Sequence, residues 1–215
     1  PDVTPEQIKA LHTKYIAERD RRIKKDHNEQ YIAASGKWAD IYEGDPYTPI
    51  APREPVNGET DVVILGAGYC GMMVAAQLKK AGISNFYNVD HGGNWGGTWY
   101  WNRYPGLQCD NDSLVYMPFL EETGYMPSKK FANGYEIYDH AQIIAETFGL
   151  KDNALFHTLI QSLKWDEASN RWRVGTNRGD DIKARFVVMA MGPLNKPKLP
   201  GIPGIDKFKG KIFHT

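Results

Sequence analysis

The sequence predicts an α/β fold in which a parallel sheet carries helices and a small antiparallel excursion, preceded by a helical N-terminal extension. Three observations predict it. Residues 62–65 form a continuous apolar run rich in β-formers, which is typical of a buried parallel strand. A glycine-rich turn, a helical pattern over 72–81 and a second strand at 86–89 follow directly. Residues 186–191 form a further apolar run of strand length.

The first forty-odd residues form a region of their own. Thr4 occupies the position of a helix cap, Pro5 takes the first helical position and Gln7 completes a capping box. Apolar residues follow at helical spacing: Ile8, Leu11 and Tyr15. The charged run at 21–26 marks the helix end and is better explained as a solvated face than as an interaction patch. Residues 47–55, with three prolines, predict an extended connector.

The glycine-rich turn has the spacing G-x-G-x-x-G in a strand–turn–helix context, which predicts a Rossmann-like dinucleotide site. Gly66 allows the tight turn, Gly68 lets a pyrophosphate approach the backbone, and Gly71 lets helix and strand pack closely. The free amides and positive end of the helix then face the phosphates. Asp90 ends the second strand, where a carboxylate accepts hydrogen bonds from ribose hydroxyls. Its charge would repel a 2′-phosphate, so FAD and NAD remain for this pocket.

Residues 92–106 are dense in glycine and aromatic side chains and follow directly on the ribose-binding acid. A dehydrogenase with a single nucleotide domain would continue into another helix at this point. A loop with stacking rings and exposed backbone amides suits a flavin instead. Each tryptophan taken alone is explained as well by core packing. FAD is therefore favoured over NAD.

These motifs resemble the front of Baeyer–Villiger monooxygenases. The resemblance rests on the turn at 66–71, the stretch Gly96–Gly106 that reads GGTWYWNRYPG, and the pair Cys109-Asp110. The end of the chain resembles the beginning of the family fingerprint FxGxxxHTxxxW, with matches at Phe208, Gly210, His214 and Thr215. The resemblance runs from about residue 61 to residue 215.

The resemblance implies an enzyme that uses FAD and NADPH to insert one oxygen atom of O2 into a ketone, giving an ester or lactone. It implies that Cys70 offers its backbone amide, that Asp110 lies near the flavin and orients an arginine, and that Ile160 places its backbone against the adenine. Asp110 is the expected catalytic residue. The expected cofactor-binding residues are Gly66, Gly68, Cys70, Gly71, Asp90, Gly97, Thr98, Trp99, Tyr100, Trp101, Asp110, Tyr116, Ile160 and Gly192. No metal site is expected.

The second half completes the expected domain organisation. Residues 154–163 and 165–176 predict short strands around a turn at 166–170, before the chain returns to the parallel sheet and Gly192 ends the strand. The proline-rich segment 193–203 predicts an extended connector. We expect a helical extension and connector over 1–58, the first part of an FAD-binding domain over 59–198, and a linker over 199–215. No second glycine-rich unit follows Gly71, so the NADPH-binding domain is expected outside this chain, which alone should not oxygenate.

Bulk properties exclude some roles. Lys plus Arg and Asp plus Glu both count 26, so no global charge attracts nucleic acid or an anionic membrane. Two cysteines form no disulfide framework, and a cytoplasmic location is expected. A flavin monooxygenase that oxidises nitrogen or sulfur, and a non-catalytic FAD-binding fragment, remain as alternatives to a ketone-oxidising enzyme.

Overall fold

The computed structural model describes residues 3–212 and 214. They form two compact units. One comprises the chain up to Tyr42 together with the segment that begins at Pro197, and the other comprises Glu43–Lys196. Each unit is described by itself. The expected division of the chain at 58/59 and 198/199 stays a prediction.

The smaller unit contains helix α1 (Pro5–Arg22) and a two-stranded antiparallel sheet. The predicted capping box is confirmed, because the Thr4 hydroxyl accepts from the Gln7 amide at 3.3 Å and the Gln7 side chain accepts from the Thr4 amide at 2.9 Å. In the sequence, strand β1 (Tyr31–Ala33) lies between the short 3-10 helices η1 (His27–Gln30) and η2 (Gly36–Trp38). Strand β1 pairs with β8 (Lys198–Pro200). The segment 193–203 is therefore not a plain connector.

The larger unit is built on a six-stranded mixed sheet with the order β4-β3-β2-β7-β6-β5. Four strands run parallel: β2 (Asn57–Leu65), β3 (Phe86–Val89), β4 (Ala154–Leu155) and β7 (Asp181–Met189). Two strands form the antiparallel part: β5 (Ile160–Asp166) and β6 (Arg171–Thr176). The predicted α/β class with an antiparallel excursion is confirmed.

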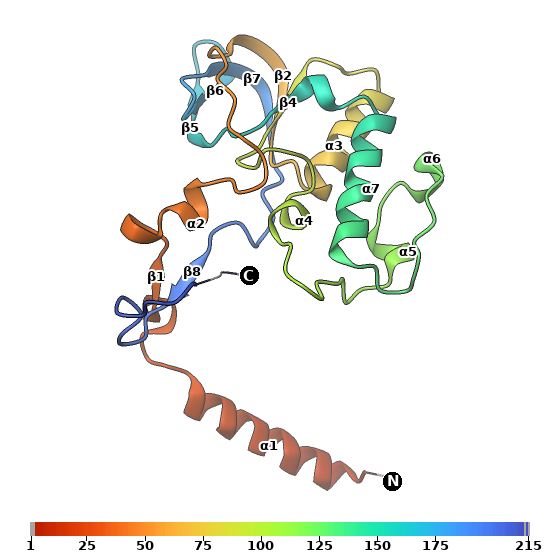
Figure 1. Ribbon diagram of the computed structural model, residues 1–215. Helices are drawn as coiled ribbons and strands as arrows, with labels where there is room; N and C mark the ends of the chain where they lie inside the picture. The colour runs from red at the N-terminus through yellow and green to blue at the C-terminus, as the bar shows by residue number, and fades with distance from the viewer. Residues whose placement is uncertain (1–2, 213, 215) are drawn as a thin grey trace. The chain divides into compact units, whose positions relative to one another are not determined.

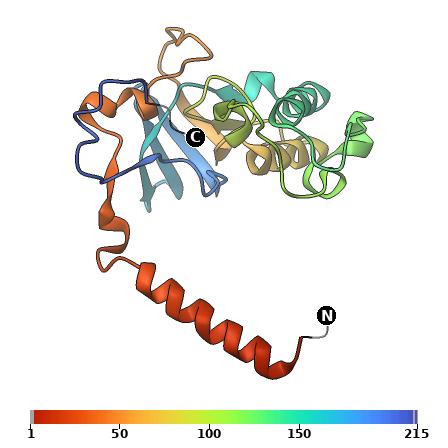
Figure 2. The same ribbon diagram turned by 60° about the horizontal axis from the view of Figure 1, so that its bottom comes forward.

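Two long helices of this unit lie side by side on one side of β2, as Figures 1 and 2 show: α3 (Tyr69–Lys80) and α7 (Gly134–Thr147). The shorter elements are α2 (Asp40–Glu43), where the two units meet along the chain, α4 (Thr98–Trp101), α5 (Ser113–Tyr116), α6 (Leu120–Thr123) and η3 (Lys151–Asn153). Within the part of the chain that the structure describes, no helix is both long and apolar enough to cross a bilayer.

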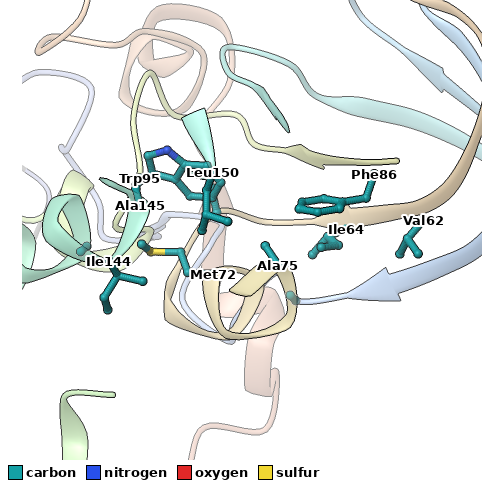
Figure 3. Packing of buried hydrophobic residues seen from close by; sticks show 12 residues of the cluster. Val62, Ile64, Met72, Ala75, Phe86, Trp95, Ile144, Ala145 and Leu150 are labelled. Atoms are coloured by element: carbon teal, nitrogen blue, oxygen red, sulfur yellow. The ribbon is translucent and has the colours of Figure 1, made fainter. Parts of the chain in front are cut away.

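The sheet buries apolar side chains on both faces, because alternate residues of a strand point to opposite sides. Val62 and Ile64 of β2 pack with Met72 and Ala75 of α3, and this cluster also includes residues of β3 and α7 and the loop residues Trp95 and Leu150 (Figure 3). Val63 and Leu65 of the same strand pack in a second cluster with residues of β3, β4, β6 and β7. Burial on both faces explains the unbroken apolar run at 62–65.

Three sequence-based expectations about the elements are corrected. The helix after the glycine turn begins at Tyr69 rather than Met72, because Gly68 is its N-cap and the turn leads straight into it. The strand expected at 154–163 is divided between β4 and β5, because His157 adopts a left-handed backbone conformation (φ 48°) between them. The loop expected at 92–106 contains the helical turn α4.

Candidate functional site

The turn between β2 and α3 holds the phosphate-binding candidates. Gly66 has φ +111°, and a Cβ there would collide with the backbone carbonyl of Ala190, so this position requires glycine. The first helical hydrogen bond runs from the Met72 amide to the Gly68 carbonyl at 3.0 Å. The amides of the first turn of α3, at residues 69–71, therefore have no partner within the helix and carry its positive end.

Gly71 brings the helix against the strand. A Cβ at Gly71 would collide with the Gly66 carbonyl oxygen and would lie 3.0 Å from the Asn88 side-chain nitrogen. Asn88 is fully buried in β3 and donates to that same Gly66 carbonyl at 3.0 Å. The turn is thus fixed from the neighbouring strand, and the close approach expected at Gly71 is present.

Asp90 lies at the C-terminal end of β3, beside the turn. Its two carboxylate oxygens accept hydrogen bonds from the Ala67 amide at 2.5 Å and the Gly92 amide at 2.7 Å. Burial raises the pKa of Asp90, and the two amide hydrogen bonds oppose that rise. Each oxygen uses one lone pair on an amide, so a second acceptor site on each remains for two neighbouring hydroxyls.

The glycine–aromatic loop closes on the turn. The Gly96 amide donates to the Ala67 carbonyl at 3.0 Å. Gly97 has φ +55°, and a Cβ there would lie 2.7 Å from the Gly68 Cα. Gly68 and Gly97 thus allow the backbones of the turn and the loop to lie in contact, and α4 starts directly at Thr98. The loop and the turn therefore lie backbone to backbone and form one cradle.

The tryptophans of α4 have different neighbours: Trp99 contacts Tyr116, and Trp101 contacts His91. Trp99 is buried, and its indole N–H donates to the Tyr116 hydroxyl at 2.8 Å. Burial raises the pKa of Tyr116, and the charge of Asp110 adds to the rise while the Trp99 hydrogen bond opposes it. Asp110 itself is exposed. Trp101 stacks on His91, with ring centres 5.2 Å apart.

The structure therefore brings together most of the predicted cofactor residues, namely Gly66, Gly68, Gly71, Asp90, Gly97, Thr98, Trp99, Tyr100 and Trp101. Cys70 is exposed in the first turn of α3, and its amide is one of those at 69–71 that have no partner within the helix. Gly192 is exposed three residues after β7 ends. Ile160 begins β5 and pairs with Thr176, whereas the amide that reaches the Asp90 carbonyl comes from Thr158, at 2.8 Å.

Two buried carboxylates were missed by the sequence analysis. The Asp45 side chain is 2% exposed and accepts from Tyr100, His157 and Gly93. Burial alone would raise the pKa of Asp45, but the hydrogen bonds from Tyr100, His157 and the Tyr47 and Thr48 amides lower it. The local signal was the Asp-Pro-Tyr-Thr sequence at 45–48, which is typical of an Asx turn.

The second missed carboxylate is Asp180, whose side chain is fully buried. Arg53 donates to both of its oxygens at 2.6 Å, and the Thr176 hydroxyl and Val56 amide add two more hydrogen bonds. Arg53 also donates to the Thr158 hydroxyl at 3.1 Å. The connector before β2 is thus tied to the segment that contacts Asp90.

Acid is expected to weaken the larger unit through Asp180. Burial opposes ionisation, but Arg53, Thr176 and the Val56 amide lower the pKa of Asp180 from 3.8 to about 2. Because the folded-state pKa is the lower one, this stabilisation is complete above about pH 5 and is lost as the pH falls through 2. We expect urea denaturation to show a loss of roughly 1–2 kcal/mol over that window. Asp180→Asn should make the free energy of unfolding depend less on pH in this range. An unchanged pH dependence would contradict the assignment of this effect to Asp180.

A shallow cleft of about 140 Å³ lies beside α4, lined by residues such as Trp99, Arg103 and Tyr138. The Arg103 guanidinium lies 3.7 Å from the centre of the Tyr47 ring and 5.1 Å from that of Tyr138. Cation–π contacts of this kind hold a guanidinium in place beside the cleft. Within residues 3–212 and 214, no group of three or more His, Cys, Asp or Glu side chains is placed to hold a metal ion.

Residues 63–215, from within β2 onward, match the family described as pyridine nucleotide-disulphide oxidoreductase. The chain belongs to this family. Among the relatives of this chain, a Baeyer-Villiger monooxygenase of Streptomyces coelicolor is 45% identical over 215 residues, which cover all of this chain and 36% of that protein.

Solved structures agree with this relationship. The polycyclic ketone monooxygenase of the thermophilic fungus Thermothelomyces thermophila matches with a TM-score of 0.89 at 36% identity, over 98% of this chain and 37% of the other. OTEMO in complex with FAD and NADP matches with a TM-score of 0.67 at 31% identity, over 75% of this chain and 30% of the other. The resemblance to Baeyer–Villiger monooxygenases is confirmed. The chain spans about a third of the length of the relatives it matches.

Proposed function

We propose that this chain is the FAD-binding part of an FAD- and NADPH-dependent Baeyer–Villiger monooxygenase, with residues 59–198 as the first part of that domain. One observation carries the proposal: free amides of the first turn of α3, the Asp90 carboxylate and the Gly97 backbone converge on a single cradle. Helix N-termini of this kind bind phosphates. OTEMO, a structural relative, is described in complex with FAD and NADP.

The residues present fit an FAD molecule. Amides at 69–71 would hold the diphosphate, and the second acceptor sites of the Asp90 oxygens would hold two ribose hydroxyls. A Cβ at Gly68 would lie 3.5 Å from the Gly97 Cα, so these two glycines present backbone and no side chain to a diphosphate bound at the turn. When bound, FAD supplies the redox chemistry by which an oxygen atom reaches a ketone.

The remaining predicted residues would work at the flavin end of the cradle. Trp99 holds the Tyr116 hydroxyl, and burial keeps that phenol protonated because it raises the pKa of Tyr116. Asp110 is exposed beside it, where its carboxylate can orient a cation supplied by the rest of the enzyme. We assign the Ile160 backbone to the adenine of FAD, as the resemblance implies. We assign Gly192 to the part of the same site that follows the end of β7.

The rest of the enzyme would pack against the end of β7. Strand β6 pairs with β7 from Asp181 to Ala184, whereas β2 pairs with it through Met189. Large apolar side chains are exposed on and after this segment: Phe186, Met189, Met191 and Leu194. An exposed apolar surface beside an unpaired strand edge is suited to a further part of the protein. That part would bind NADPH and the ketone, and two free cysteines are compatible with a cytoplasmic location.

The visible spectrum of the purified chain tests the proposal. The 215-residue chain is incubated with FAD, freed of unbound flavin by gel filtration and then denatured. We expect the released chromophore to have the spectrum and chromatographic mobility of FAD. Release of NAD, or a chain that carries no chromophore after incubation, would contradict it.

A further inference from the structure

Asp45 makes more hydrogen bonds than its own turn requires. Its Oδ1 accepts from the amides of Tyr47 at 2.9 Å and Thr48 at 3.1 Å, which forms the local turn. Its Oδ2 accepts three further hydrogen bonds, from the Tyr100 hydroxyl at 2.6 Å, His157 Nε2 at 2.9 Å and the Gly93 amide at 2.9 Å. Five donors on one carboxylate compensate for burying its charge.

Two of the three distant donors, Gly93 and His157, are next in the chain to residues that contact Asp90. The Gly92 amide donates to Asp90 Oδ1, and the neighbouring Gly93 amide donates to Asp45. On the other side, the His157 amide donates to the Gly92 carbonyl at 3.0 Å, and the next amide, of Thr158, donates to the Asp90 carbonyl at 2.8 Å. Asp45 therefore binds both segments that hold Asp90 and touches neither Asp90 nor the glycine turn.

The segment at His157 needs a restraint. Its φ of 48° is in the left-handed region, which costs a non-glycine residue roughly 1 kcal/mol. The His157 side chain is 10% exposed, and a Cβ at Gly93 would lie 2.5 Å from its Nε2. The hydrogen bond to Asp45 and this close packing fix the ring, and with it the backbone that contacts Asp90.

We propose that Asp45 is a positioning residue for the nucleotide site. It fixes the Gly92–Gly93 backbone and the His157–Thr158 backbone, and these in turn set the place of the Asp90 carboxylate. Tyr100 extends the effect to α4, because its hydroxyl bonds Asp45 and lies 2.8 Å from the Thr48 hydroxyl. The inference rests on the proposed function, since the nucleotide is taken to be FAD.

The test compares Asp45→Asn with a matched variant, Glu136→Gln. Glu136 is also a carboxylate hub, which accepts from the Tyr125 hydroxyl at 3.0 Å and from the amide and hydroxyl of Ser128 at 2.6 Å. It contacts none of the residues around Asp90 in the described chain. An asparagine at 45 carries no charge and must turn its NH2 group toward either the Tyr47 and Thr48 amides or the Gly93 amide, so at least one hydrogen bond that holds Asp45 in place is lost.

Two measurements are made on the 215-residue chain. The Kd for FAD is measured by quenching of flavin fluorescence, and amide hydrogen exchange is followed without FAD over 91–100 and 156–159. We expect Asp45→Asn to raise the Kd about tenfold or more and to speed exchange in both segments. Glu136→Gln should keep the Kd within about twofold of the wild-type value, even if its urea midpoint falls as far as that of Asp45→Asn.

Each outcome decides a separate point. For Asp45→Asn, unchanged hydrogen exchange in both segments or an unchanged Kd for FAD would overturn the inference. It would also be overturned if both variants lost affinity for FAD in proportion to their loss of stability. A wild-type chain that fails to bind FAD would refute the proposed function, while the exchange data would still decide whether Asp45 positions the loop. Should Asp45→Asn not fold, Tyr100→Phe removes one donor and should raise the Kd by a smaller factor, and an unchanged Kd there would count against the inference.

Discussion

Replacing Gly71 with alanine is expected to destabilise the larger unit severely. The added methyl group would collide with the Gly66 carbonyl oxygen, which belongs to the backbone and cannot rotate away. That carbonyl is held by Asn88, and the Gly66 amide donates to the Val89 carbonyl at 2.8 Å. Relief would require the helix to move off the strand, so we expect a loss of at least about 3 kcal/mol in the free energy of unfolding.

Urea denaturation followed by far-UV circular dichroism measures this effect, with Gly68→Ala as the control. Gly68 has φ −74°, and a Cβ there would meet the Gly97 Cα at an ordinary contact distance of 3.5 Å. Gly68→Ala should therefore fold with nearly unchanged stability and lose affinity for FAD instead, because the methyl group occupies space that the diphosphate needs. Equal stability of the Gly71→Ala variant and the wild-type chain would refute the packing argument.

Replacing Asp90 with asparagine is expected to abolish most FAD binding while the fold persists. Both Asp90 oxygens accept backbone amides, so an asparagine must turn its NH2 group toward either the Ala67 or the Gly92 amide. One hydrogen bond is lost, and the acceptors for the two ribose hydroxyls are reduced to one. We expect the Kd for FAD to rise roughly 10- to 100-fold.

Fluorescence titration measures this change, and Asp61→Asn is the matched control. Asp61 lies in β2 of the same sheet, is partly exposed, and accepts hydrogen bonds from Asn85 at 3.2 Å and from Arg185 at 3.3 Å. Its replacement should leave the Kd for FAD unchanged. Similar Kd values for Asp90→Asn and the wild-type chain would contradict the ribose role of Asp90.

The sequence predicted the parts of the site that depend on local order along the chain. The turn at 66–71 and the acid at 90 are read from spacing, because each strand ends where its apolar run ends. The capping box at Thr4 is equally local, and its prediction was confirmed. Local patterns of this kind fix their geometry within a few residues.

The parts that were missed depend on contacts between distant residues. Asp45 reaches His157 across 112 positions, and Arg53 reaches Asp180 across 127, so neither pairing leaves a periodic pattern. The division between β4 and β5 was hidden because Leu155, Phe156 and Ile160 continue the apolar run through His157. The pairing of β1 with β8 is another contact between distant segments, and it was missed for the same reason.

Competition by the two halves of FAD tests the central claim most directly. The 215-residue chain is titrated with FAD, and then the bound flavin is challenged with ADP or with FMN at equal concentrations. Because the proposal assigns the α3 amides to the diphosphate and Asp90 to the ribose, ADP should displace FAD at far lower concentrations than FMN. Displacement by FMN with no effect of ADP, or no FAD binding at all, would contradict the assignment of the glycine turn as the nucleotide site.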